Sequence, residues 1–286
     1  MNPFIADRFL LWILRALAAM AAGVVFLIGV FLLVEAAPVL ARVGIWRFFS
    51  DGSWYPTRGF FDLRPMIAGT ALATAGAVAV ATPLALLVAV FCRFYAPRPV
   101  ARLTRRVIEL LAGVPSVVYG FWGLVVLVPI IGRLRPPGPS LLAGLSILAL
   151  MILPTIALMA DVALAGVPRS HRLGCAALGL SRWAMLRNVV LPEAGPGLLT
   201  AVLLGTGRAL GETMAVVMVC GNVVQVPPHL LAPMRTLTAN IALEMAYAAG
   251  DHRGALFVSG LVLAGMVTLL VVAAGAFETR RIQTDA

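Results

Sequence analysis

The chain has 286 residues, of which 61% are hydrophobic and only 12% are charged. With Gly counted and Tyr left out, the apolar share is roughly 69%, against about 45–50% in soluble domains. This composition excludes a soluble globular protein. All 22 basic residues are arginine, so the net charge of +10 owes nothing to lysine. Phosphate-binding loops of the GxxxxGK[ST] type and Schiff-base chemistry both require a lysine, and neither is available to this chain.

Six apolar stretches are each long enough to cross a bilayer as a helix of about 20 residues. No stretch between them exceeds about 35 residues, which is too short for an independent domain with its own core. We therefore predict an all-α integral membrane protein with a single transmembrane domain over residues 1–286. No A-x-A-like cleavage site follows the first stretch, so we expect it to be retained. The predicted spans cover residues 10–34, 66–92, 107–131, 141–163, 194–220 and 254–277.

The arginines favour an orientation with both termini in the cytoplasm, because cytoplasmic loops carry the excess of positive charge. This orientation places thirteen arginines inside, Arg280 and Arg281 among them, and eight outside. The densest cluster, Arg98–Arg106, then lies in a short inner loop. Two outer segments are longer than a simple turn. Residues 38–64 carry aromatic side chains suited to the membrane interface or to a docking surface. Residues 235–249 are expected to form a short helix that either caps the bundle or re-enters it.

Residues 164–193 form a patterned inner loop between the fourth and fifth spans. Pro168 and Ser170 predict the start of a helix, and Gly179 predicts a left-handed cap at its end. A second short helix then leads to Leu191-Pro192. The loop is therefore predicted to be a helix-turn-helix at the cytoplasmic face, presenting arginine and histidine.

This inner loop resembles the cytoplasmic coupling loop of ABC importer permeases, in which a Gly is followed after nine residues by an aliphatic-x-Leu-Pro tail. Gly179 and the segment Val189–Pro192 match that pattern. The usual Glu-Ala-Ala six residues before the Gly is replaced by Leu173-Gly174-Cys175, so the carboxylate that makes an ionic contact in the family has no counterpart at this position. The residues that the resemblance implies in ATPase coupling are Ala176, Ala177, Gly179, Arg182, Leu191 and Pro192.

Five further segments resemble the PstC-type permease subunit of the bacterial phosphate ABC importer. In chain order they are Glu109–Gly120, Met151–Thr155, Gly207–Val216, Gly221-Asn222 and Arg235–Glu244. The resemblance implies the type I ABC importer permease fold (MetI-like) with six transmembrane helices. It also implies that the chain forms half of the pathway for inorganic phosphate in the cell inner membrane.

The same resemblance implies the partners. They are a sister permease subunit of the PstA type, two ATPase subunits of the PstB type and an external phosphate-binding protein of the PstS type. ATP is then used by the ATPase subunits, and this chain carries no cofactor and no catalytic centre of its own.

Arg208 lies near the middle of the fifth predicted span, where an arginine costs at least about 2.5–3.5 kcal/mol unless it faces protein or water. Glu212 lies four residues on and shares its helix face, so it is the candidate counter-ion. Small residues every four positions from Gly197 to Ala209 allow another helix or a wet cavity to come close. Two interpretations remain open. Either the two side chains form a packing ion pair, or the planar guanidinium binds the passing anion in exchange for Glu212.

The break at Gly113-Val114-Pro115-Ser116 in the third span is a second candidate for the substrate pathway. Pro115 leaves a carbonyl unpaired, and the amides of a half-helix restarting at Ser116 attract anions. A simple proline kink explains the same pattern equally well.

The leading interpretation is the membrane subunit of an ATP-driven phosphate importer, with sulfate, molybdate or phosphonate as alternative cargo. A secondary anion carrier would use Arg208, Glu212 and Asp161 as coupling residues, but it needs no ATPase dock at Gly179. An intramembrane enzyme is disfavoured because no Ser or Cys lies near a candidate His within a span, and no carboxylate pair or metal cluster occurs.

Overall fold

The computed structural model describes residues 3–284, and for residues 3–7, 9, 274 and 276–284 it describes the course of the backbone alone. The side chains of Arg280 and Arg281, which entered the orientation argument, lie outside that description. The chain divides into two compact units. One runs up to Asp62 and again from Glu244 to Val262, and the other comprises Leu63–Leu243 with the chain from Leu263 onward.

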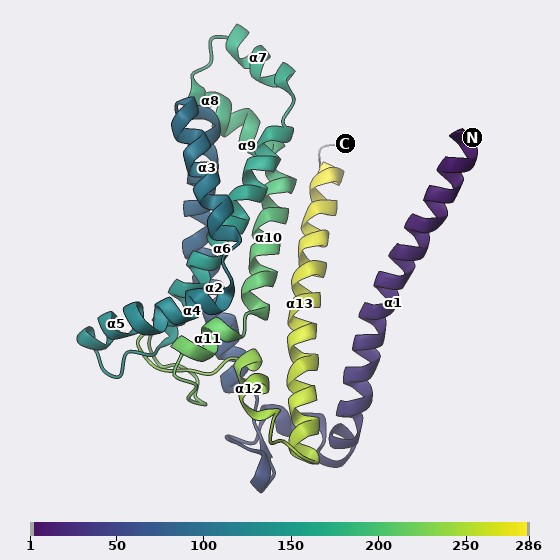
Figure 1. Cartoon of the computed structure of the whole chain (residues 1–286), viewed down its shortest axis with the longest axis vertical. Helices are drawn as coiled ribbons and strands as arrows, with labels where there is room; N and C mark the ends of the chain where they lie inside the picture. Colours follow the sequence, from purple (N-terminus) through teal and green to yellow (C-terminus); the bar gives the residue numbers. More distant parts are fainter. Residues whose placement is uncertain (1–2, 285–286) are drawn as a thin grey trace. The chain divides into compact units, whose positions relative to one another are not determined.

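The larger unit is helical (Figure 1). Its helices are α2 (Arg64–Val90), α3 (Arg98–Ala112), α4 (Ser116–Trp122), α5 (Val128–Leu134), α6 (Leu141–Gly166), α7 (Arg169–Ala177), α8 (Arg182–Met185), α9 (Leu191–Glu193), α10 (Gly195–Gly211), α11 (Met214–Val219) and α12 (Leu237–Glu244). Wider, π-helical turns extend three of them: η3 (Phe91–Tyr95), η4 (Gly123–Leu127) and η5 (Leu186–Val190).

The core of this unit is a stack of α2, α6 and α10, which lie side by side. The Ser140 hydroxyl caps α6 by accepting a hydrogen bond from the Ala143 amide at 3.3 Å. α2 presents alanines at every fourth position, from Ala73 to Ala85, and each is almost fully buried. Side chains this small let helix axes approach closely in a membrane, where packing drives association.

The small residues of α10 also contact α6 directly. A Cβ atom on Gly205 would lie 2.5 Å from Cγ1 of Ile156, and one on Gly197 would lie 2.7 Å from Cβ of Ala163. Neither position has room for a larger side chain. The predicted small-residue stripe is therefore confirmed as the contact face for another helix.

Six spans were predicted, and the part of the chain that the structure describes holds five helices long and apolar enough to cross a bilayer. These are Leu10–Val43, Arg64–Tyr95, Ser116–Leu134, Leu141–Gly166 and Asp251–Ala273. A sixth is reached when the pair Arg182–Glu193 and Gly195–Gly211, bent by 69°, is counted as one span. The spans predicted at 10–34, 66–92, 141–163 and 254–277 coincide with helices. The first is longer because Pro38 lies inside its helix and does not end it.

The other two predicted spans need correction. The third was predicted from 107 to 131, but the backbone leaves the helix between Ala112 and Ser116, so the apolar span begins at Ser116. α3 is a separate helix that carries the Arg98–Arg106 cluster. The fifth was treated as one helix over 194–220, whereas α10 ends at Gly211 and α11 begins at Met214.

The smaller unit joins α1 (Pro3–Val43) to the start of α13 (Asp251–Thr284) through the aromatic segment. That segment includes η1 (Ile45–Phe49), η2 (Pro56–Arg58) and an antiparallel hairpin of β1 (Trp54–Tyr55) with β2 (Phe60–Phe61). The Phe31 and Phe257 rings pack edge to face, with centroids 5.6 Å apart. Trp54 Nε1 and His252 Nε2 lie 2.9 and 2.8 Å from the same oxygen, Oε2 of buried Glu244.

Candidate functional site

The interruption between α10 and α11 places Arg208 and Glu212 in different surroundings. Arg208 lies in the last turn of α10, and its Nη1 donates to the Thr155 hydroxyl of α6 at 3.3 Å. Glu212 follows the helix with an extended backbone, and its Oε1 accepts from the Ala215 amide at 3.0 Å. Glu212 therefore caps the start of α11.

The predicted ion pair between Arg208 and Glu212 is wrong, because the described residues show none between these two side chains. The expectation assumed continuous helix, which places residues four apart on one face. Here the chain turns out of the helix at Glu212, so that relation does not hold. Arg208 keeps a neutral hydroxyl partner and its full positive charge.

A polar cluster from the segment after α11 lies against the same interruption. The Thr238 hydroxyl donates to the Glu212 carbonyl at 2.8 Å. Arg235 donates from Nε to the Asn222 carbonyl at 2.9 Å and from Nη1 to Asn240 Oδ1 at 3.0 Å. Asn222 has a positive φ of 56°, a conformation that asparagine tolerates better than most residues.

Sequence reasoning did not single out Arg235, Thr238 or Asn240 as site residues, because it left open whether their outer segment caps the bundle or re-enters it. The available signal was the segment Arg235–Glu244, which carried part of the family resemblance. The fold brings this segment inward because the Leu237 amide donates to the Thr70 hydroxyl of α2 at 3.0 Å. Asn240 is fully buried as a result.

The break at Gly113-Val114-Pro115-Ser116 leads into α4, which packs against α11 beyond the interruption at Glu212. Pro115 has no N–H to offer the Leu111 carbonyl, and the Tyr119 hydroxyl donates to that carbonyl instead, at 2.8 Å. The expected unpaired carbonyl is thus satisfied within the chain. The helix that restarts at Ser116, α4, packs against α11, since a Cβ atom on Gly120 would lie 2.8 Å from Cα of Ala215. The capture of an anion by the amides at Ser116 stays a prediction.

The inner loop has the predicted form of two short helices joined at a glycine. Gly179 has a φ of +70°, and its amide donates to the Ala176 carbonyl at 3.1 Å. The Leu180 amide donates to the Cys175 carbonyl at the same distance. These bonds close the end of α7 as a left-handed cap does. Ser181 then caps α8 by accepting from the Ala184 amide at 3.2 Å.

The inner loop is anchored on one side and exposed on the other. Leu186 and Val190 are fully buried, and Leu191 packs against their cluster, so Leu191 supports the loop from within. By contrast Leu178 is 80% exposed and Trp183 is 62% exposed. Ala176, Ala177, Arg182 and Pro192 are exposed as well. Large exposed apolar side chains make this loop a candidate contact surface for another protein or for the membrane.

Asp161 ties three helical segments together next to this loop. Its carboxylate accepts from Arg93 Nε at 2.8 Å and from Arg105 Nη2 at 2.6 Å. Asp161 thus forms ion pairs with two arginines. Asp161 is therefore occupied as a structural ion-pair partner, which removes one of the coupling residues that a secondary carrier would use.

Apolar helices long enough to cross a bilayer, interrupted next to an arginine and joined by a loop with exposed apolar side chains, define a multi-pass membrane permease. The match to known families agrees with this class. The chain belongs to the family described as binding-protein-dependent transport system inner membrane component, whose model matches residues 81–283.

Individual relatives are similar over most of their length. A probable ABC transporter permease of Bacillus subtilis is 40% identical over 82% of this chain and 78% of its own. The phosphate transport system permease protein PstC of Mesorhizobium japonicum is 35% identical over 83% of this chain and 79% of its own. A PstC protein of Mycobacterium tuberculosis is 36% identical over 83% of this chain and 78% of its own.

Solved structures support the fold. A bacterial alginate ABC transporter aligns with a TM-score of 0.65 at 14% identity, covering 96% of both chains. The MetNI methionine ABC transporter in an inward-facing form aligns with a TM-score of 0.59 at 19% identity, covering 79% of this chain and 97% of its own. The predicted MetI-like permease fold is confirmed by these alignments.

Proposed function

We propose that this chain is the transmembrane permease subunit of an ATP-driven phosphate importer. The observation that carries the proposal is the similarity to phosphate permeases, such as the 35% identity over 83% of the chain to the Mesorhizobium japonicum protein. The chain forms half of the pathway for inorganic phosphate and passes the motion of a cytoplasmic ATPase to it. It catalyses no reaction itself, and ATP is used by its partners.

The proposed partners are a sister permease of the PstA type, two ATPase subunits of the PstB type and an external binding protein of the PstS type. The ATPase docks on the inner loop, where Leu178 and Trp183 offer exposed apolar area. Gly179 fixes the turn between α7 and α8, and Leu191 holds the loop to the bundle. Both termini then lie in the cytoplasm of the inner membrane.

The proposed contact for the anion is Arg208. Among the described residues its guanidinium bonds to a neutral hydroxyl alone, at 3.3 Å, so none of their carboxylates cancels its charge. An arginine is charged at any physiological pH, and its planar fork suits a tetrahedral oxyanion. Glu212 contributes by holding the start of α11. The break from Gly113 through Pro115 to Ser116 is assigned to the pathway because α4, which begins there, packs against α11.

The test is phosphate uptake by cells that lack their own phosphate permease and produce this chain with the products of its neighbouring genes. We expect uptake of radioactive phosphate that ceases when the ATPase or the external binding protein is left out. An excess of sulfate or molybdate should leave this uptake unchanged. Uptake that persists without the ATPase would identify a secondary carrier, and inhibition by sulfate or molybdate would assign another cargo.

A further inference from the structure

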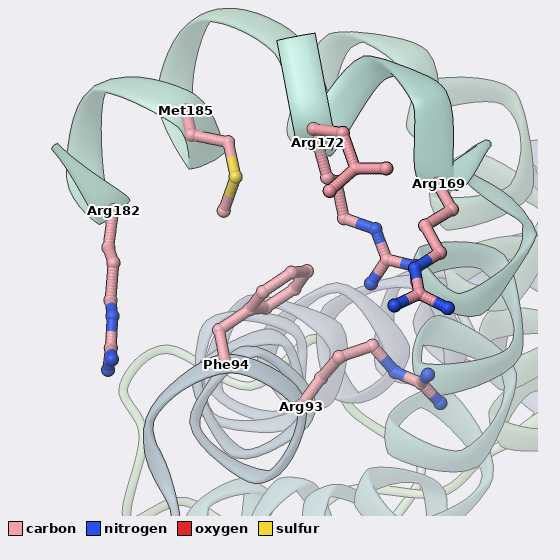
Figure 2. A pocket seen from close by; sticks show the side chains of 7 residues that line it. Arg93, Phe94, Arg169, Arg172, Arg182 and Met185 are labelled. Carbon is pink, nitrogen blue, oxygen red and sulfur yellow. The ribbon is translucent and has the colours of Figure 1, made fainter. Parts of the chain in front are cut away.

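A hollow of about 560 Å³ lies between the inner loop and the end of the second span (Figure 2). We call it the inner arginine pocket. Its walls come from η3, α7 and α8, and it shares no residue with the interruption at Arg208. The lining residues are Arg93, Phe94, Arg169, Arg172, Leu173, Arg182 and Met185.

The charge in this pocket is unbalanced. Four of the seven lining residues are arginines, and none is acidic. Arg93 shares Asp161 with Arg105. Among the described residues, Arg169, Arg172 and Arg182 have no ion-pair partner.

One buried donor lies among the arginines of this pocket. Nε of Arg172 is buried and has no hydrogen-bond partner in the part of the chain that the structure describes. A buried donor to which nothing is bonded is costly, and more so when the group carries a charge. Figure 2 shows the guanidinium groups of Arg93, Arg169 and Arg172 on one side of the hollow, with that of Arg182 on the other. Like charges gathered in this way repel, and an anion between them removes the repulsion.

The donor set selects the chemistry of the anion. Guanidinium groups match phosphoryl oxygens in pairs, through short charge-assisted hydrogen bonds. The ring of Phe94 and the side chain of Met185 form an apolar wall beside the arginines. Basic pockets between transmembrane helices on the cytoplasmic side bind lipid head groups, and an apolar wall suits the part of a lipid next to its phosphate.

We propose that the inner arginine pocket binds a phosphoryl anion through Arg93, Arg169 and Arg172, supplied either by free phosphate or by the head group of an anionic phospholipid. Arg169 and Arg172 belong to α7, while Arg93 and Phe94 belong to η3 at the end of the second span. A bound anion therefore joins the inner loop to the bundle. The inference goes beyond the transport of phosphate and does not depend on it.

The test uses the full chain in nanodiscs and compares two double variants. Arg169→Gln with Arg172→Gln removes the charges from the pocket, and Arg133→Gln with Arg135→Gln removes two exposed arginines elsewhere as the matched control. Arg208 is intact in both, so any difference between them belongs to the pocket. If the double variant does not fold, the single change Arg169→Gln, at an exposed side chain, replaces it.

The first arm measures binding of inorganic phosphate in nanodiscs of phosphatidylcholine. The second arm measures, by native mass spectrometry, the phosphatidylglycerol retained from nanodiscs that contain both lipids. Losing hydrogen bonds to charged groups should weaken binding by about tenfold or more in the pocket variant and leave the control unchanged. A loss in the first arm supports the proposal with free phosphate as the ligand, and a loss in the second supports it with lipid.

Two results would overturn the proposal. One is equal binding of phosphate and equal retention of phosphatidylglycerol in the two double variants. The other is a pocket variant that keeps both phosphate binding and lipid retention but no longer binds its ATPase partner. The arginines would then be contacts for an acidic protein surface.

Discussion

Arg208 is the residue whose chemistry determines the proposed pathway. Its Nη1 reaches the Thr155 hydroxyl at 3.3 Å, which leaves most of the guanidinium donors for a ligand. Asp161, by contrast, is held by two arginines and has no such freedom. Arg208 is therefore the candidate for the transport site, and Asp161 is a partner in a structural ion pair.

Replacing Arg208 tests its role. Arg208→Lys keeps the charge but loses the planar fork, so uptake of phosphate should fall by roughly tenfold or more. Arg208→Ala should abolish uptake while the protein still folds, because no carboxylate is left unpaired. Uptake in membrane vesicles, with the amount of assembled protein measured in parallel, gives the answer. Near-normal uptake by Arg208→Ala would refute the role.

Two substitutions of Glu212 distinguish a role in capping α11 from a role of its negative charge. Glu212→Gln keeps an oxygen that can accept from the Ala215 amide, whereas Glu212→Ala removes it. Loss of a helix cap costs about 1 kcal/mol, so we expect thermal unfolding in detergent to shift down for Ala and very little for Gln. Equal destabilisation by both changes would mean that the charge, and not the cap, matters.

At the scale of the helix, the contact between α10 and α6 depends on glycine. Gly205→Ala places a Cβ atom 2.5 Å from Cγ1 of Ile156, and overpacking of this kind costs about 1–3 kcal/mol. Gly207→Ala is the matched control, since a Cβ there meets no atom within 4 Å. Thermal unfolding of the two variants should differ accordingly. A lower melting temperature for Gly207→Ala than for Gly205→Ala would contradict the packing described here.

The inner loop offers a second matched pair of glycines. Gly179 has a φ of +70°, so Gly179→Ala is strained by roughly 1–2 kcal/mol. Gly174 lies inside α7 in open space, and Gly174→Ala should be tolerated or slightly stabilising. In the assembled importer, we expect substrate-stimulated ATP hydrolysis to fall for Gly179→Ala only. Equal activities would argue against the loop as the ATPase contact.

Apolar length predicted most spans, because the bilayer imposes that length on a helix whatever it packs against. The exceptions lie where backbone chemistry interrupts a helix. Pro115 was recognised as a break, but not as the point where the span begins. Glu212 was placed on the face of Arg208 because nothing in Gly211-Glu212-Thr213 reveals that the helix ends there. The inward position of Arg235 depends on a long-range bond to Thr70, which a local pattern does not contain.

At the scale of the whole molecule, the chain combines polar side chains at the interruption between α10 and α11 with an inner loop that has exposed apolar side chains. As the proposed importer subunit, the chain works together with ATPase partners. On its own it should not hydrolyse ATP, because it has no lysine for a phosphate-binding loop.

The most direct test is phosphate uptake by proteoliposomes that contain this chain, its sister permease and the ATPase subunits. With ATP inside and the phosphate-loaded binding protein outside, the account predicts accumulation of phosphate against its gradient. Vesicles in which this chain is omitted, or carries Arg208→Ala, should accumulate none. Accumulation at the normal rate by the Arg208→Ala assembly, or none by the complete assembly with phosphate but uptake with another oxyanion, would contradict the account.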